Sequence, residues 1–73
     1  MEAGFTAVVQ QRDACWIGWI EEVPGVNSQG ATRDELLENL RSALDEALEM
    51  NRADARAAAG DAPYEEVRVS PAA

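Results

Sequence analysis

The sequence predicts an α+β domain in which an antiparallel sheet is covered on one face by one helix. Three observations predict this class: apolar segments of strand length fill residues 5–29, leucines at helical spacing follow, and a short alternating segment ends the chain. The expected order is β-β-β-α-β, in a single domain over residues 1–73 with an ordered core from 3 to 70.

The first two expected strands form a hairpin. Residues 5–11 (FTAVVQQ) show the alternation of a strand, and residues 12–14 supply a short polar loop. Residues 15–21 (CWIGWIE) form the second strand, which is apolar on both faces. A strand of this kind is typically covered on both sides.

The two tryptophans of the second strand point to opposite faces, because successive side chains of a strand alternate. We expect Trp19 to lie beneath the helix, together with Cys15 and Ile17. The other face then needs a second protein surface to cover it, and its members are Trp16, Gly18 and Ile20.

A type II turn is expected at residues 23–26 (VPGV). Pro24 presets φ at the second position of such a turn, and Gly25 accepts the positive φ that the third position demands. A short extended piece over residues 26–29 and a break at Gly30 then lead to the helix.

The helix begins at a capping box, TRDE, in residues 32–35. In such a box the Thr32 hydroxyl accepts a hydrogen bond from the Glu35 N–H, and the Glu35 carboxylate reaches back to the Thr32 N–H. Leucines and alanines then recur at helical spacing as far as Met50.

The end of the helix is open. The alanine-rich segment 53–59 has high helix propensity, and Gly60 is a natural stop. The helix therefore either ends near Asn51 or continues to Ala59, in which case it extends past the sheet or meets another chain.

Residues 64–70 (YEEVRVS) predict a fourth strand. Glu65, Val67 and Val69 fall on one face, and the intervening residues fall on the other.

Composition limits the classes of partner and of chemistry. The net charge is −8, from 14 acidic residues and 6 arginines, which disfavours nucleic-acid binding and suits a basic partner. The chain has no histidine, and Cys15 is its only cysteine, so an intrachain disulfide is excluded. Zinc binding lacks the ligands it needs, and nucleophilic catalysis by Cys15 lacks a histidine base. We expect no enzymatic activity, no cofactor and no metal.

Size and hydropathy point to a soluble oligomer. A domain this small buries only about 60% of the surface of its unfolded chain, so we expect a homodimer or higher oligomer. No apolar run approaches the ~18 residues of a membrane span, and no signal-peptide pattern opens the chain. We therefore expect a cytoplasmic protein without a membrane partner.

Four motifs follow one another between the second strand and the helix. They are the aromatic-rich strand WIGWI, the acidic turn EVPG, the segment SQGAT, and the helix start ELLENL. Their combination at this spacing resembles the HicB-like antitoxins over residues 5–50.

The resemblance implies a partial ribonuclease-H-like or double-stranded-RNA-binding-like fold. It also implies that the chain binds and neutralises a small basic ribonuclease toxin. Antitoxins of this kind also carry a C-terminal DNA-binding segment, whereas three residues follow Ser70 here. The resemblance is thus to a standalone N-terminal-type domain, and we expect no direct nucleic-acid binding. The alternative is an orphan homo-oligomer of the same fold with a structural or small-ligand-binding role and no toxin.

The expected partner or dimer interface lies on the second strand, the acidic residues after it, and the third extended piece. Two glutamates would steer a basic partner, and Trp16 would contact it. The full set is Trp16, Gly18, Ile20, Glu21, Glu22, Asn27 and Gln29.

Overall fold

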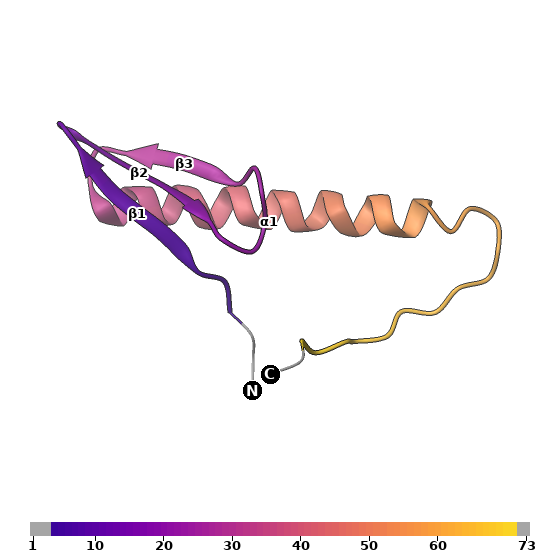
Figure 1. The fold of residues 1–73 in the computed structure, drawn as a ribbon. Coiled ribbons are helices and arrows are strands. Elements are labelled where there is room, and N and C mark those ends of the chain that lie inside the picture. Colours follow the sequence, from indigo (N-terminus) through magenta and orange to yellow (C-terminus); the bar gives the residue numbers. More distant parts are fainter. Residues whose placement is uncertain (1–3, 72–73) are drawn as a thin grey trace.

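A three-stranded antiparallel sheet and one long helix make up the computed structural model, which describes residues 4–71 (Figure 1). The strands lie in the order β1-β2-β3. The bounds are β1 Ala7–Arg12, β2 Cys15–Ile20, β3 Asn27–Gly30 and α1 Arg33–Ala57. The α+β class is confirmed, and the order over the described residues is β-β-β-α. The expected ordered core began at Ala3, which lies outside those residues.

The hairpin between β1 and β2 is tight. Arg12 is paired with Cys15, so only Asp13 and Ala14 form the loop. Asp13 has a φ of 55°, as the first residue of a two-residue hairpin loop often does. The polar loop predicted at residues 12–14 is thus confirmed, with Arg12 inside the strand.

The Pro-Gly turn that connects β2 to β3 has the expected geometry. Gly25 has a φ of 88°, and the Val26 N–H donates to the Val23 carbonyl at 3.4 Å. The predicted type II turn is therefore confirmed. It reverses the chain so that β3 pairs with β2 on the side opposite β1.

The start of α1 confirms half of the capping box. The Glu35 N–H donates to the Thr32 hydroxyl at 3.1 Å, as expected. The Glu35 carboxylate, however, accepts from the Ala31 N–H at 2.6 Å, one residue before the predicted donor. Both bonds satisfy backbone donors that lie at or before the first helical turn.

The helix covers the face of the sheet opposite to the one predicted. Ile20 is only 7% exposed and belongs to the core with Val26, Leu36 and Leu40, and Trp16 packs against this cluster. A Cβ added to Gly18 would lie 3.2 Å from the side chains of both Leu36 and Leu40. The prediction that Cys15, Ile17 and Trp19 lie beneath the helix is therefore wrong.

Gly18 gives the physical reason for this choice of face. A helix packs closest to a sheet where a strand residue has no side chain, and the helix leucines fill that space. The opposite face carries Ile17 and Trp19 at the centre of the same strand, and their bulk would hold the helix backbone farther away.

The helix extends well beyond the sheet. Its 25 residues span about 37 Å, whereas a strand of six residues spans about 20 Å. Leu36 and Leu40 are its buried residues, and no residue after Leu48 within the helix is even half-buried. The helix therefore ends at Ala57, between the two ends that the sequence left open. Its last turns, residues 49–57, extend past the sheet, and we call them the overhang (Figure 1).

The fourth strand predicted at residues 64–70 is absent. This segment is extended but unpaired, and all of it is exposed. It runs back beside the overhang, where Arg56 Nε lies 3.7 Å from Glu66 Oε1 (Figure 1). Because the helix passes the end of the sheet, the returning segment meets the helix overhang before it can reach β1.

Candidate protein-interaction surface

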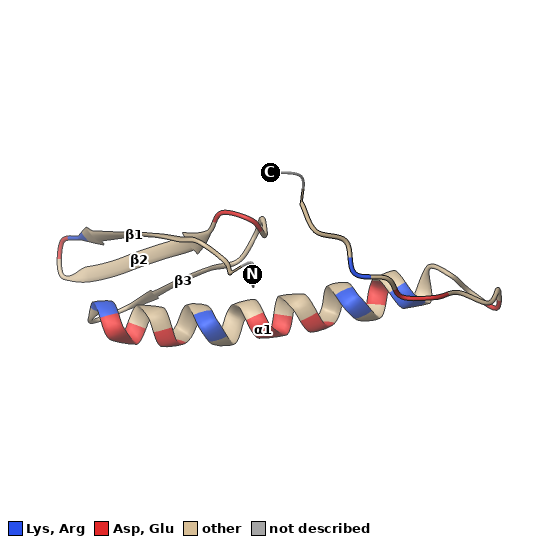
Figure 2. Cartoon of the chain, turned by 90° about the horizontal axis from the view of Figure 1, so that it is seen from below, with Lys and Arg blue, Asp and Glu red and all other residues tan. Residues whose placement is uncertain are grey.

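One face of the sheet has no helix on it. The strand register places eight side chains there, which we call the outer sheet face: Val8, Gln10, Arg12, Cys15, Ile17, Trp19, Asn27 and Gln29. The helix and the sheet form two layers (Figure 2), so this face is directed away from α1. Over residues 4–71, no other helix or strand covers it.

Two cross-strand rows form the centre of the outer sheet face, and Arg12 with Cys15 forms a third at the hairpin end. Trp19 lies between Val8 of β1 and Asn27 of β3. Ile17 lies between Gln10 and Gln29 in the next row. The centre is therefore apolar and aromatic, and amide side chains flank it.

Trp19 is the most prominent side chain of this face. It is 39% exposed, although tryptophan is normally well buried in a domain core. Beside it lies an open depression of about 380 Å³, lined by residues of β2 and β3 from Ile17 to Trp19 and from Asn27 to Gln29. An aromatic side chain next to a shallow hollow with polar walls is typical of a protein-binding surface.

The outward backbone of β3 is partly satisfied by the helix. Asn39 Nδ2 donates to the Gln29 carbonyl at 2.8 Å, on the edge of β3 that faces away from β2. Asn27 Nδ2 donates to the Gly25 carbonyl at 3.4 Å. These bonds hold the loop and edge that form the polar wall of the depression.

The two glutamates after β2 form hydrogen bonds to Thr6, the residue before β1. Glu22 Oε1 accepts a hydrogen bond from the Thr6 N–H at 2.8 Å, and this bond lowers the pKa of the Glu22 carboxyl. The Glu21 N–H donates to the Thr6 carbonyl at 2.9 Å. Glu21 keeps an exposed carboxylate, whereas that of Glu22 is already engaged within the chain.

The predicted interface residues therefore lie in three places. Asn27 and Gln29 lie on the outer sheet face, and Glu21 and Glu22 lie where β1 begins. The remaining three face the helix, which corrects the expectation that they form an uncovered surface: Trp16, Gly18 and Ile20.

Sequence reasoning missed Val8, Ile17 and Trp19 as the apolar centre of the uncovered face. The signal that could have found them is Gly18. A glycine in the middle of a strand often marks the close approach of another backbone or helix, and here it marks the helix side.

No arrangement suited to metal binding appears among residues 4–71. No three histidine, cysteine or acidic side chains of this part of the chain gather closely enough to hold an ion. Cys15 is half-buried, and its Sγ lies 3.7 Å from the Gly30 carbonyl oxygen. Its surroundings are those of a packed side chain at the first residue of β2.

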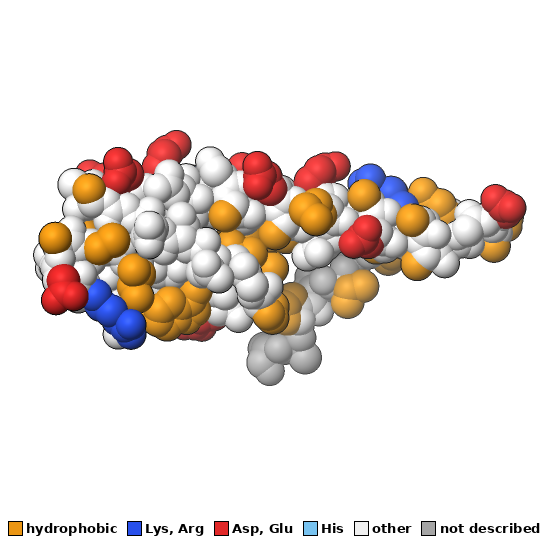
Figure 3. Space-filling view, turned by 90° about the horizontal axis from the view of Figure 1, so that it is seen from above, with side chains coloured by type: hydrophobic (Ala, Val, Ile, Leu, Met, Phe, Trp, Pro, Cys, Tyr) orange, Lys and Arg blue, Asp and Glu red, His pale blue; other side chains and the backbone are white. Residues whose placement is uncertain are grey.

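Charge is distributed mainly along α1. Acidic side chains outnumber arginines along its length in Figure 2, and they are spaced along one long edge of the molecule in Figure 3. Two arginines of the helix are paired locally, Arg41 with Glu38 at 3.4 Å and Arg52 with Glu49 at 3.5 Å. Such exposed pairs contribute little stability, so the excess of carboxylates mainly sets the field around the molecule.

Within the described residues the one helix, α1, is not apolar enough to cross a membrane.

No protein-family profile, no curated protein and no solved structure matches this chain.

Proposed function

We propose that this chain is an interaction domain that binds a basic protein partner through its outer sheet face. The observation that carries the proposal is the position of Trp19, which is exposed at the centre of a sheet face that α1 leaves uncovered. In many protein interfaces, most of the binding energy comes from aromatic side chains that become buried when the partner binds and that polar residues surround.

Charge supports a basic partner. A net charge of −8 on 73 residues produces a negative field that speeds the approach of a positively charged protein. Glu21 is the carboxylate best placed to act near the sheet, since Glu22 accepts a bond from Thr6. The same charge opposes binding to phosphate backbones.

Within this class we propose that the partner is a small basic ribonuclease toxin, which the domain neutralises by covering its active surface. The support is the resemblance of residues 5–50 to HicB-like antitoxins. The turn and the helix start, two of the motifs that carry it, lie at the two ends of β3.

The test is a search for a small basic open reading frame next to this gene, followed by co-expression of its product with the domain. We expect that reading frame to arrest growth alone and the domain to restore growth. Trp19→Ala should abolish the rescue and weaken binding at least tenfold, as removal of an aromatic anchor does. Met50→Ala removes an exposed apolar side chain from the helix overhang and should leave rescue intact. A source genome without such a reading frame, or rescue by Trp19→Ala at wild-type strength, would contradict the proposal.

A second candidate is a homo-oligomer of the same fold without a toxin. The exposed apolar residues of the C-terminal segment favour it, because Tyr64, Val67 and Val69 are 55%, 69% and 87% exposed. Self-association and partner binding would use different surfaces, so a homo-oligomer is compatible with the toxin proposal, and absence of toxin binding and of rescue is what would favour the second candidate.

A further inference from the structure

We propose that residues 64–70 of one copy add to the free edge of β1 in a second copy, so that the domain is a strand-exchanged homodimer. The proposal concerns a surface separate from the outer sheet face and does not rest on the proposed function. It gives the C-terminal segment the strand role that its alternation predicts, with the partner strand supplied by another chain.

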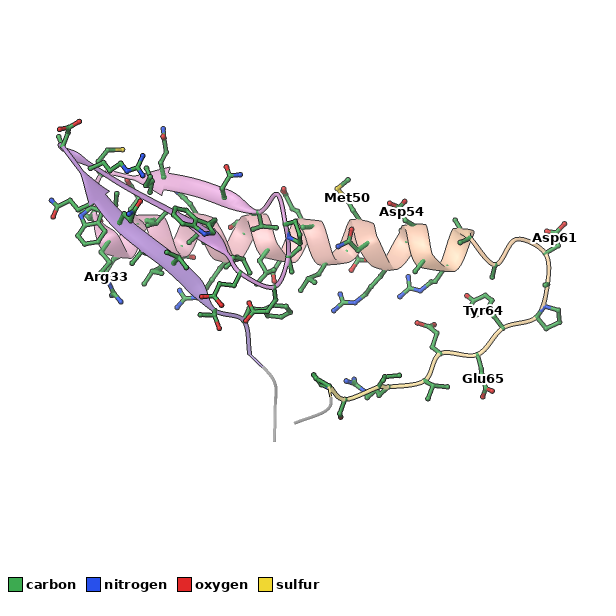
Figure 4. All side chains as sticks on the ribbon, in the orientation of Figure 1. Arg33, Met50, Asp54, Asp61, Tyr64 and Glu65 are labelled. Carbon is green, nitrogen blue, oxygen red and sulfur yellow. The ribbon has the colours of Figure 1, made fainter. Side chains whose placement is uncertain are left out.

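The apolar side of the segment is directed away from its own helix. Glu66 faces the helix, since it pairs with Arg56. In an extended chain the neighbouring positions point the other way, and Val67 and Val69 are accordingly 69% and 87% exposed. Figure 4 shows the same alternation at its start, where Tyr64 points toward α1 and Glu65 points away. Val67 borders an open cavity beside Ala55 and Ala59 of the helix, and Val69 does not line it, so both valines stay largely exposed in their own chain.

An apolar groove lies along the edge of the sheet that a new strand would join. β1 is an outer strand of the sheet, and over residues 4–71 no strand lies beyond it. Between this edge and the helix is a groove of about 160 Å³. Its apolar lining consists of Phe5, Ala7, Ile20, Leu37, Leu40 and Leu44. A strand added to β1 would pair with its unpaired backbone groups and place alternate side chains in the groove.

The length of the chain assigns the groove to a second copy. From Glu66, which is level with Arg56, the four residues to Ser70 extend about 13 Å, equal to about nine residues of helix. The segment therefore reaches only the level of Ala47, whereas the groove is lined by Leu37, Leu40 and Leu44. To fill it, the segment of the same chain would have to move farther along the helix and also turn its valine side over.

The turn after the helix opposes that movement. The Gly60 N–H donates to the Ala57 carbonyl at 3.1 Å, and the Ala62 N–H donates to the Ala59 carbonyl at 3.3 Å. These bonds hold the start of the segment at the far end of the helix. A second copy has no such restriction, because its segment can approach the edge of β1 from outside.

Charge at the groove is complementary to the segment. Arg41 is the one charged residue among those that line the groove. Glu65 lies on the same side of the segment as the two valines. A strand that inserts Val67 and Val69 would therefore bring the Glu65 carboxylate to the wall that carries Arg41.

The first experiment measures molecular mass in solution by light scattering at micromolar and higher concentrations. We expect twice the 7.9 kDa of one chain. Replacing both valines, Val67→Asp with Val69→Asp, should convert the dimer to a monomer with unchanged helix content, because neither side chain contributes to the core. Glu66→Gln, on the other side of the segment, is the matched control and should remain dimeric. A wild-type monomer, or a dimer that survives both aspartates, would overturn the proposal.

The second experiment separates exchange between chains from docking within one chain. In a Cys15→Ser background, Gln10→Cys and Arg68→Cys place one thiol on β1 and one on the segment. A short bis-maleimide should join a sample that mixes the two single-cysteine proteins into a heterodimer. The same reagent should convert the double variant, which carries both cysteines, into a covalent dimer. An internally closed monomer from the double variant, with no heterodimer from the mixture, would show that the segment docks on its own chain and overturn the exchange.

Discussion

Leu36 packs directly over Gly18: a Cβ added to the glycine would lie 3.2 Å from Leu36 Cδ2 and 2.8 Å from the Val8 carbonyl oxygen. This contact determines which face of β2 lies beneath the helix. It places Ile20 in the core and leaves Trp19, on the alternate face, exposed. Trp19 is available to a partner because the helix covers the other face of β2.

Gly18→Ala should destabilise the domain by about 1–3 kcal/mol, the usual cost of adding a methyl group where packing is already tight. The backbone oxygen of Val8 cannot move aside as the end of a flexible side chain could. Urea denaturation followed by circular dichroism measures the change. Gly4→Ala is the control, because an added Cβ there meets nothing within 4 Å. Equal stability of the two variants would mean that the helix does not press on Gly18.

Gly25→Ala should also destabilise the domain, by about 1–2 kcal/mol, but for a different reason. Its φ of 88° is unfavourable for alanine, whereas the space around it is open. Gly25→Asn should cost less, since asparagine tolerates positive φ better than alanine does. Thermal unfolding of both variants checks this order. Equal losses for alanine and asparagine would argue against a backbone origin.

The bond from Thr6 to Glu22 predicts a pH dependence. The folded-state pKa of Glu22 is lowered, so its contribution to stability is complete above the unfolded pKa of about 4.3 and is lost as pH falls through the lower folded value. The wild type should therefore exceed Glu22→Gln in stability at pH 7, and this difference should shrink below about pH 4. Urea midpoints at pH 7, 4 and 3 measure it. Glu21→Gln is the control, and a pH-independent difference for Glu22→Gln would contradict the assigned role of its carboxylate.

Local chemistry accounts for the features that could be predicted from the sequence. The Pro24-Gly25 turn and the Thr32 cap each depend on a few neighbouring residues, and both formed as expected, apart from the donor that Glu35 selects. The α+β class follows from the apolar periodicity of the strands and helix, which is also a local property.

The features that could not be predicted depend on distant contacts. Both faces of β2 are apolar, so alternation alone cannot decide whether Trp16 or Trp19 lies beneath the helix. The choice depends on how Leu36 and Leu40 meet Gly18. Likewise, residues 64–70 have the alternation of a strand, but pairing requires an edge within reach. The run of helix to Ala57 moves the segment away from β1.

The measurement that tests the central claim most directly is acrylamide quenching of Trp19 in a Trp16→Phe variant, alone and with the small basic protein found to be encoded beside this gene. Trp19 is then the only fluorophore of its kind in the domain. The account predicts strong quenching of the free domain, because this side chain is 39% exposed, and clear protection once the partner is bound. Trp19 that is shielded in the free domain, or that stays equally quenchable in a saturated complex, would contradict the outer sheet face as the binding surface.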